Sequence, residues 1–499
     1  MLELDGTSLT IPDVCSVARS AVPVALSPAA RTAMERSRSV IDALAAGDAP
    51  IYAVNTGVGY LANLRIPRED LDRLQRNVIR SHAAGVGEPL AREVVRAMML
   101  IRANVLAKGF SGIRALVADL LCDLLNRGVT PIVPSQGSVG ASGDLAPLAH
   151  IALVLTGEGE AEYQGAVLPG GEALARAGIE PVELHPKEGI SLINGTQAML
   201  AIGCLELEAA RVLANSADVI AAMTVDALRG TPRAFDPRIQ EVRPHPGQAA
   251  SAERLRRLFE GSEIRQSHLG CGRVQDAYSL RCIPQVHGAV HDAIEEAARV
   301  FAIEVNAATD NPLVFDGEIL SGGNFHGEPL AFQLDFLAIA LSALAGISER
   351  RIDRLVNPAL NEGLPPFLAG HPGLESGLMM VQVTAASLVA ENRVLAHPAS
   401  TGSITTSGNK EDFVSMGMTS GLKLQRIVSN TRAVLAIEAL AASRAIDLLA
   451  PLKTSPVLEA VRMRIRDVSP RIDGDRPFHR DIAAIADLIA AGGLIPSAP

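Results

Sequence analysis

Apolar residues recur at helical spacing along much of the chain, and its second half carries the longest such patterns. They cover residues 195–228, 286–307, 329–356, 378–395 and 412–449. Apolar patterns of more than about 25 residues are typical of long bundle helices. Two stretches, 336–346 and 434–442, are apolar on nearly every side, which indicates helices buried on several faces. Residues 196–499 are therefore predicted to form a bundle of long helices.

The first 195 residues show shorter and more varied patterns. Apolar spacing predicts helices over 31–46, 71–84, 91–107 and 113–126. Prolines indicate a strand-and-turn entry over residues 1–33, and residues 51–66 suit a short strand followed by a mobile, glycine-containing loop. A hairpin-like segment lies at 161–178. We therefore expect a smaller mixed part over 1–195 and a mainly α fold for the chain as a whole.

Composition supports helices packed on helices. The 499 residues contain no Trp and only 3% aromatic residues, whereas strands favour aromatic and β-branched side chains. One chain has limited surface with which to cover such apolar helices, so subunits are expected to associate around a central bundle. The most apolar run, 336–347, is too short to cross a bilayer and is predicted to be a buried core helix.

Charge and cysteine usage narrow the partners and the compartment. Lys and Arg number 45 and Asp and Glu 55, a formal charge of −10, and no basic run with interleaved aromatics occurs. Nucleic acid is therefore not an expected partner. Five cysteines without a CxxC pair indicate reduced thiols, and Glu3 and Asp5 stand where a secretion signal would be basic. These features predict a cytoplasmic protein that does not bind a membrane.

The most unusual stretch is residues 134–150, which read PSQGSVGASGDLAPLAH. Its three glycines let the backbone fold on itself. At its centre, the nitrogen of Gly143 could attack the carbonyl of Ala141 to close a five-membered ring. Loss of water from Ser142 would then leave an exocyclic methylidene, a strong electrophile. The ordinary alternative is a glycine-rich turn that precedes a helix, with Asp144 or Ser142 as its N-cap.

The string GSVGASGDLAPLAH resembles the prosthetic-group loop of the aromatic amino acid ammonia-lyase family, which includes histidine ammonia-lyases. In that family Ala-Ser-Gly becomes 4-methylideneimidazole-5-one (MIO). The resemblance runs from about Pro12 to about Leu488. It implies the long-helix bundle of the histidase and fumarase type, a homotetramer, and MIO formed from Ala141, Ser142 and Gly143.

Two further strings implicate residues before this loop. Tyr52 opens YAVNTGVG, which resembles the catalytic-tyrosine loop of the family, so Tyr52 is implied as an active-site acid or base. His82 lies in SHAAGVGEPL, the string of histidine ammonia-lyases, and is implied to contact the substrate side chain. Without the resemblance, Tyr52 suits a strand aromatic and His82 a favourable charge at the C-terminus of a helix.

Asn194 and the stretch 275–282 provide the next candidates. Asn194 in LINGTQ suits the N-cap of a long helix, and the resemblance places it near the prosthetic group and the substrate. QDAYSLRC resembles the family closely, which implies Gln275 in substrate binding and Tyr278 as the base for the β-proton or its neighbour. Arg281, a planar cation suited to a carboxylate, would bind that of the substrate. A buried Tyr and a surface ion pair are the ordinary alternative.

The last two candidates follow turns. GGNFHGEP resembles the family, where the Phe, here Phe325, packs beside the prosthetic group and the substrate ring. Glu411 precedes a predicted helix, where acids are expected from the helix dipole, and its motif position faces it toward a substrate imidazole as acceptor or base. Many histidine ammonia-lyases read NQED followed by His, whereas this chain has Lys410 and Phe413, which alters the groups available to a ring.

These residues together predict elimination of ammonia from L-histidine to give trans-urocanate. No external cofactor or metal is expected, because no nucleotide-binding loop is present and His287 and His291 suit ordinary helix positions. The departures at Lys410 and Phe413 leave open a tyrosine or phenylalanine ammonia-lyase, or an aminomutase. A serine hydrolase built on the Gly/Ser-rich loop and an inactive helical scaffold are the alternatives from other classes.

Overall fold

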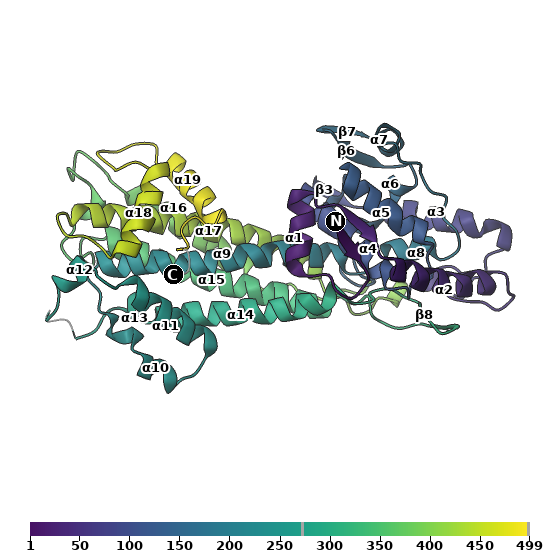
Figure 1. Cartoon of the computed structure of the whole chain (residues 1–499), viewed down its shortest axis with the longest axis horizontal. Helices are drawn as coiled ribbons and strands as arrows, with labels where there is room; N and C mark the ends of the chain where they lie inside the picture. Colours follow the sequence, from purple (N-terminus) through teal and green to yellow (C-terminus); the bar gives the residue numbers. More distant parts are fainter. Residues whose placement is uncertain (271–273, 497–499) are drawn as a thin grey trace. The chain divides into compact units, whose positions relative to one another are not determined.

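The computed structural model describes residues 1–270 and 274–496, which form two compact units. Unit 1 comprises Met1–Leu205, Ala298–Asp335 and Pro398–Leu422, and unit 2 comprises Glu206–Ala297, Phe336–His397 and Lys423–Pro499. The division predicted at residues 195 and 196 is a single cut, whereas each unit of the structure collects three segments. Helices α9, α14, α15 and α17 have residues in both units (Figure 1).

Unit 1 surrounds its core with short and medium helices. The helices that lie wholly within it are α1 (Ile11–Ser20), α2 (Pro28–Ala45), α3 (Leu71–His82), α4 (Arg92–Ala107), α5 (Ala115–Arg127), α6 (Leu145–Leu155), α7 (Gly170–Ala177) and α8 (Glu188–Ile193). Helix α4 is the centre of this unit, because fourteen consecutive residues of it, from Val94 to Ala107, are buried. The four helices predicted over 31–46, 71–84, 91–107 and 113–126 are therefore confirmed as α2 to α5.

The strands of unit 1 are short and form four small sheets. They are β1 (Leu2–Leu4), β2 (Val24–Leu26), β3 (Val86–Pro89), β4 (Thr130–Pro131), β5 (Pro134–Gln136), β6 (Glu160–Tyr163), β7 (Ala166–Pro169), β8 (Leu313–Phe315) and β9 (Glu318–Leu320). Strands β1 and β2 pair in parallel, whereas β3 with β5, β4 with β6, β6 with β7 and β8 with β9 are antiparallel. The predicted hairpin is β6–β7, and helix α7 follows it directly.

One local prediction near the N-terminus is incomplete and another is wrong. Strands β1 and β2 lie within residues 1–33 as expected, but a helix was missed there. Residues 1–33 contain helix α1, because Pro12 lies in its first turn, where proline is tolerated, and Thr10 forms a capping box with Asp13. The start of 51–66 is not a strand but a turn, in which the Asn55 side chain accepts a hydrogen bond from the backbone nitrogen of Ile51 at 2.7 Å. The side chain of Asn55 thus replaces a strand partner.

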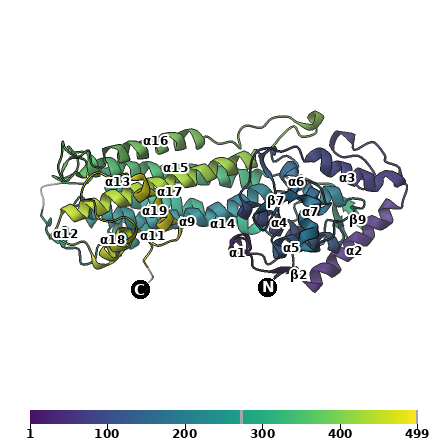
Figure 2. The same ribbon diagram turned by 90° about the horizontal axis from the view of Figure 1, so that it is seen from above.

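Unit 2 contains the long helices predicted from the sequence. Its elements are α9 (Gln197–Ala227), α10 (Pro237–Glu241), α11 (Pro246–Leu258), α12 (Glu263–Gln266), α13 (Tyr278–Arg281), α14 (Ile283–Glu304), α15 (Glu328–Val356), α16 (Met379–Leu395), α17 (Gly417–Leu448), α18 (Pro456–Val468) and α19 (His479–Ala490), with α9, α14, α15 and α17 shared with unit 1. Figures 1 and 2 show α9, α14, α15 and α17 running alongside one another within this unit.

A buried charge network connects these four helices. Asp218 of α9 accepts a hydrogen bond from Nδ1 of His287 on α14 at 2.8 Å. The guanidinium of Arg351 on α15 lies 3.3 Å from Nε2 of the same histidine and binds both carboxylate oxygens of Glu438 on α17, at 2.6 and 2.8 Å. Because one chain of polar contacts reaches every helix, their registers are fixed relative to one another.

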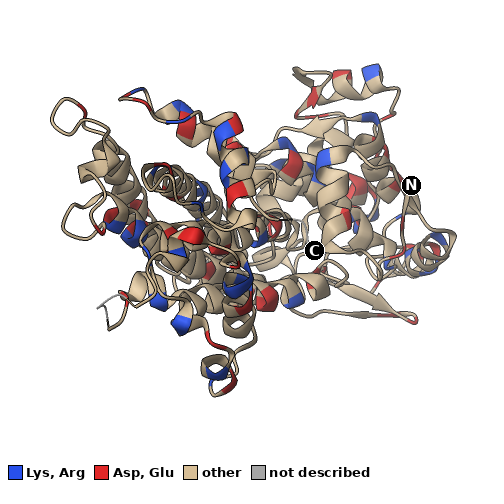
Figure 3. Cartoon of the chain, turned by 60° about the vertical axis from the view of Figure 1, so that its left-hand side comes forward, with Lys and Arg blue, Asp and Glu red and all other residues tan. Residues whose placement is uncertain are grey.

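The surface of the helices carries both signs of charge and some apolar side chains. Figure 3 shows Lys and Arg interspersed with Asp and Glu along the helices. Helix α15 is long and apolar enough to cross a membrane by length and composition, but 56% of its most apolar window is buried inside the protein, which is typical of a core helix. The burial predicted over 434–442 is complete in α17, whereas Phe336 and Ile339 of α15 are exposed in this single chain. Cys271 lies outside the described residues; Cys15, Cys122 and Cys204 are buried free thiols and Cys282 is half-buried.

Replacement of Asp218 tests the network. Burial would raise the pKa of this carboxyl, but hydrogen bonds from His287 and His291 outweigh burial and hold the pKa well below its ordinary value. Asp218→Asn leaves buried donors and the Arg254 guanidinium without their anion, which we expect to cost about 3–5 kcal/mol and to lower the thermal unfolding midpoint.

The control is Asp48→Asn, which breaks an exposed pair with Arg65 and is expected to change stability by less than about 1 kcal/mol. Since a lowered pKa gives stability that is present above the unfolded pKa and lost as pH falls, the gap between Asp218→Asn and wild type should narrow below about pH 4. Equal unfolding midpoints of the two variants at neutral pH would contradict this role for Asp218.

Candidate active site

The glycine-rich loop of residues 137–144 meets the chain again just before α9. Gly143 forms a backbone bridge with Gly195 and has a φ of +74°. A β-carbon on Gly143 would lie 2.2 Å from the carbonyl oxygen of Gly195, so no larger residue fits there. The close approach brings Ser142 against the residue before that bridge, Asn194.

Asp144 holds this approach in place. Its carboxylate accepts hydrogen bonds from the backbone nitrogens of Ala198 and Met199, both at 2.9 Å, in the first turn of α9. Ser138 donates to its other oxygen at 2.8 Å. Burial raises the pKa of Asp144 to about 6, against the opposing effect of these donors. Asp144 therefore caps α9, 54 and 55 residues later in the chain, and makes no side-chain cap to α6, which follows it directly.

Asn194 points its amide at the backbone of the triplet. Its Nδ2 donates to the carbonyl oxygen of Ser142 at 2.8 Å, whereas its buried Oδ1 has no hydrogen-bond partner among the described residues. Asn194 ends α8 instead of capping α9, the position expected from sequence. Three features fit a ring closed within Ala141, Ser142 and Gly143. Gly143 and Gly195 have no room for a β-carbon, the Asn194 amide donates to the Ser142 carbonyl, and the Asn194 Oδ1 acceptor has no partner among the described residues.

The hydroxyl of Ser142 contacts Glu411, 269 residues further along the chain. Ser142 Oγ donates to Glu411 Oε1 at 2.7 Å, and the hydroxyls of Thr406 and Ser407 donate to Oε2 at 2.7 and 2.8 Å. Burial alone would raise the pKa of this carboxyl. The three hydroxyl donors and the nearby charge of His82 outweigh burial and lower the pKa, so the carboxylate form is favoured.

A cavity of about 960 Å³ opens at this point, entirely within unit 1. Predicted site residues line it from six segments of the chain: Tyr52, His82, Ala141, Ser142, Asn194, Phe325 and Glu411. Gly143 lies beside them at the bridge to Gly195. The lining includes apolar groups such as Leu74, Val78 and Leu145, with a few polar groups facing the triplet, as is usual for small-molecule sites.

Local contacts orient the side chains on the first two segments. The Tyr52 hydroxyl accepts a hydrogen bond from the backbone nitrogen of Gly59 at 3.2 Å, which closes the loop that carries it. His82 Nδ1 lies 2.7 Å from the carbonyl oxygen of Val78. That contact requires a proton on Nδ1, which donates to the carbonyl oxygen.

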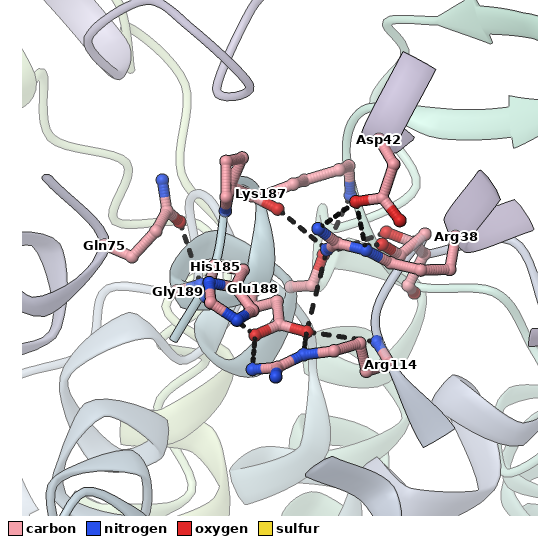
Figure 4. A network of polar contacts seen from close by, with 12 residues as sticks. Arg38, Asp42, Gln75, Arg114, His185, Lys187, Glu188 and Gly189 are labelled. Atoms are coloured by element: carbon pink, nitrogen blue, oxygen red, sulfur yellow. Dashed lines mark hydrogen bonds and ion pairs between the residues drawn. The ribbon is translucent and has the colours of Figure 1, made fainter. Parts of the chain in front are cut away.

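Buried charged and polar side chains hold the segments that line the cavity. Arg102 is fully buried and donates to the carbonyl oxygens of Ser191 and Asn194, and burial lowers its pKa to about 10. In Figure 4, the carboxylate of Glu188, at the start of α8, accepts hydrogen bonds from Nε and Nη2 of Arg114 at 2.8 and 2.6 Å. The side chain of Gln75 on α3 accepts a hydrogen bond from the backbone nitrogen of Gly189 on α8 at 2.9 Å. This contact joins α3, which carries His82, to α8, which precedes Asn194.

Three predicted residues lie elsewhere. Gln275, Tyr278 and Arg281 belong to unit 2 and are not part of the cavity lining that the structure describes. Tyr278 is 71% exposed, so it is not the buried tyrosine of the ordinary alternative, and the Arg281 guanidinium lies over its ring at 4.6 Å. The exposed Tyr278 ring and the half-buried Arg281 guanidinium therefore form an aromatic–cation pair on α13.

Tyr60 and His326 also line the cavity, although their sequence pattern did not indicate it. Tyr60 lines it and packs on Gly408, where a β-carbon would lie 3.3 Å from the Tyr60 ring. His326 also lines it and stacks on Phe413 with ring centroids 6.1 Å apart. Arg102 was missed because its only local signal is a charge within an apolar helix, at a position that a helical pattern tolerates.

Comparison with known proteins gives a consistent result. The aromatic amino acid lyase family model matches residues 9–467. A protein of Koribacter versatilis named histidine ammonia-lyase is 60% identical over 511 residues, covering 100% of this chain and 99% of the relative. One of Anaeromyxobacter sp. with the same name is 56% identical, covering 99% of each.

Solved structures agree with the sequence comparison. Histidine ammonia-lyase from Trypanosoma cruzi aligns with a TM-score of 0.91 at 44% identity, over 99% of this chain and 94% of that one. Tyrosine aminomutase from Streptomyces globisporus aligns with a TM-score of 0.94 at 39% identity, over 99% and 97%. The predicted fold class, a mainly helical bundle of this type, is confirmed. With a family match over most of its length and full-length relatives at this identity, the chain belongs to the aromatic amino acid lyase family.

Proposed function

We propose that this protein is a carbon–nitrogen lyase that eliminates ammonia from L-histidine to give trans-urocanate. The observation that carries the proposal is the cavity in which Ser142, Asn194 and Glu411 converge. Relatives named histidine ammonia-lyase at 51–60% identity over nearly the full chain support the choice of substrate. Buried free thiols such as Cys122 support a reducing compartment, the cytoplasm.

The electrophile that this reaction needs would be MIO, formed from Ala141, Ser142 and Gly143. When formed, the group supplies an electron acceptor that assists departure of the amine. Asn194 would hold its ring through the carbonyl of Ser142, as it holds that carbonyl here at 2.8 Å. The proposal requires no metal and no added cofactor.

The side chains around this group would bind the substrate ring and transfer protons. Phe325 would pack beside the substrate ring, and His82 would contact the substrate side chain. Glu411, favoured as a carboxylate, would accept from the imidazole N–H or act as a base. Tyr52, on a loop closed by Gly59, would exchange a proton at the reacting carbon.

Ser142→Ala tests the origin of the electrophile. Wild-type protein should be lighter than its encoded mass by two waters, one released when the Gly143 nitrogen condenses with the Ala141 carbonyl and one from the Ser142 side chain. Ser142→Ala cannot lose the second of these and should have activity at background level. Intact mass spectrometry and ultraviolet absorbance of the product measure the two effects. Ser135→Ala, which removes a hydroxyl from the same Gly/Ser-rich stretch, is the matched control and should behave as wild type. A wild-type mass equal to the encoded mass in active enzyme would exclude the proposal.

Substrate choice is tested by parallel turnover. L-Histidine should give a higher kcat/KM than L-tyrosine or L-phenylalanine, because Glu411 offers a hydrogen-bond acceptor that a phenyl ring leaves unpaired. Products are followed by absorbance and by chromatography for β-amino acids. Faster turnover of tyrosine would favour the tyrosine ammonia-lyase alternative. A β-amino acid as main product would favour an aminomutase, the activity named for the Streptomyces globisporus structure.

We further propose a homotetramer in which a second subunit completes each site. A substrate carboxylate needs a cation. The described lining contains no arginine, and its one lysine, Lys410, stands next to Glu411, where the substrate ring is proposed to bind. Arg281 would supply this cation from a neighbouring subunit, together with Gln275 for substrate binding and Tyr278 as the base for the β-proton or its neighbour. Exposed apolar side chains support burial between subunits; in unit 2 they include Phe336, Ile339, Met380 and Val383.

Complementation between subunits tests this arrangement. Ser142→Ala and Arg281→Met should each be inactive alone, but co-expression should restore up to about a quarter of wild-type activity, because random mixing leaves that share of sites with both native residues. Size-exclusion chromatography with light scattering gives the oligomeric state. If co-expression restores nothing although mixed tetramers form, both residues act within one subunit.

A further inference from the structure

Lys410 and Glu411 are adjacent in the chain and both line the cavity. A tight turn holds them: the backbone nitrogen of Thr406 donates to the carbonyl oxygen of Glu411 at 2.8 Å, and residues 407–409 all have positive φ. Tyr60 packs against this turn at Gly408. The two side chains therefore leave a closed turn at neighbouring positions beside the same cavity.

The hydrogen bonds of Glu411 leave one of its oxygens for a ligand. Thr406 and Ser407 occupy Oε2, whereas Oε1 accepts only from Ser142 Oγ among the described residues. Ring closure with loss of water from Ser142 removes that hydroxyl. Oε1 is then an acceptor in need of a donor, and a ligand N–H can supply it.

Lys410 offers the opposite chemistry. It is the only Lys or Arg among the described residues that line the cavity, and its ammonium makes no hydrogen bond or ion pair with the part of the chain that the structure describes. An ammonium carries three donors and no acceptor. Lys410 and Glu411 thus bring a donor and an acceptor to the same cavity.

We propose that Lys410 is a specificity-determining residue that donates to the unprotonated ring nitrogen of the substrate while Glu411 accepts from the ring N–H. This inference rests on the proposed function and names how the same site recognises its ring. A neutral imidazole presents one N–H and one acceptor nitrogen, which match the carboxylate and the ammonium in turn. Phenyl rings present neither group, and their binding would leave both charged side chains unpaired.

This assignment gives Lys410 the donor function of an amide at that position, but not its acceptor function. An amide serves a ring nitrogen in either protonation state because it both donates and accepts, whereas an ammonium serves only the unprotonated one. The stacking of His326 on Phe413, with His326 Nε2 3.1 Å from the Phe413 carbonyl oxygen, places an imidazole beside the second departure from the NQED-His pattern.

The experiment compares two ring ligands that differ in one acceptor. Imidazole has an N–H and an acceptor nitrogen, whereas pyrrole has only the N–H. Binding to matured enzyme is measured by calorimetry at about pH 8.5, where free imidazole is neutral. Lys410→Met should weaken imidazole about tenfold, as expected for loss of a charged hydrogen bond, and leave pyrrole within about twofold.

Three controls separate recognition from general damage. Lys410→Gln keeps a donor and should restore most of the imidazole affinity. Lys108→Met removes a lysine charge outside the cavity lining and should alter neither ligand. Intact mass confirms that each variant has lost two waters, so that all are compared in the matured state.

Kinetics provide a second readout. With L-histidine, Lys410→Met should raise KM about tenfold and change kcat less. An unchanged ratio of imidazole to pyrrole affinity in Lys410→Met would overturn the inference while leaving histidine turnover, and with it the proposed function, intact. Absence of histidine turnover in the wild type would instead remove the proposed function itself.

Discussion

The close approach of the 137–144 loop to the start of α9 is the constraint on which the rest of the site depends. Two glycines meet where no β-carbon fits, and the buried Asp144 carboxylate fixes the first turn of the long helix. Helix N-termini expose unsatisfied N–H groups, so a carboxylate there satisfies donors and favours the dipole at once. The loop that carries Ser142 is thereby bound to the first turn of α9.

Buried charge then transmits this rigidity to the cavity wall. Arg102, Glu188 and Gln75 tie the short helix before Asn194 to α3 and to the backbone around it, with every contact inside unit 1. Removing charges from water is costly unless each is paired, so such networks tolerate few alternative geometries. A similar network through His287 and Glu438 fixes the helices of unit 2.

The proposed site residues are divided between the two units of the chain. Unit 1 gathers the triplet, its amide donor and the carboxylate, whereas Gln275, Tyr278 and Arg281 lie in unit 2. Long helices that belong to both units offer large apolar faces for association. Assembly of subunits would then join the ring-binding and carboxylate-binding halves of a site, and would exclude water from it.

The sequence by itself determined the features that depend on local pattern. Apolar periodicity predicted α9, α14, α15, α16 and α17 to within a few residues. The Ala-Ser-Gly triplet by itself left an ordinary turn as the alternative, and the proposed ring rests on the resemblance of the surrounding string. Contacts between distant segments leave no local signal. Only the tertiary structure decided that Ser142 meets Glu411 across 269 residues, that Asp144 caps α9 instead of its own helix, and that Lys410 shares the cavity. The physical reason is that side-chain type and spacing set which elements form, whereas packing and burial set which side chains meet.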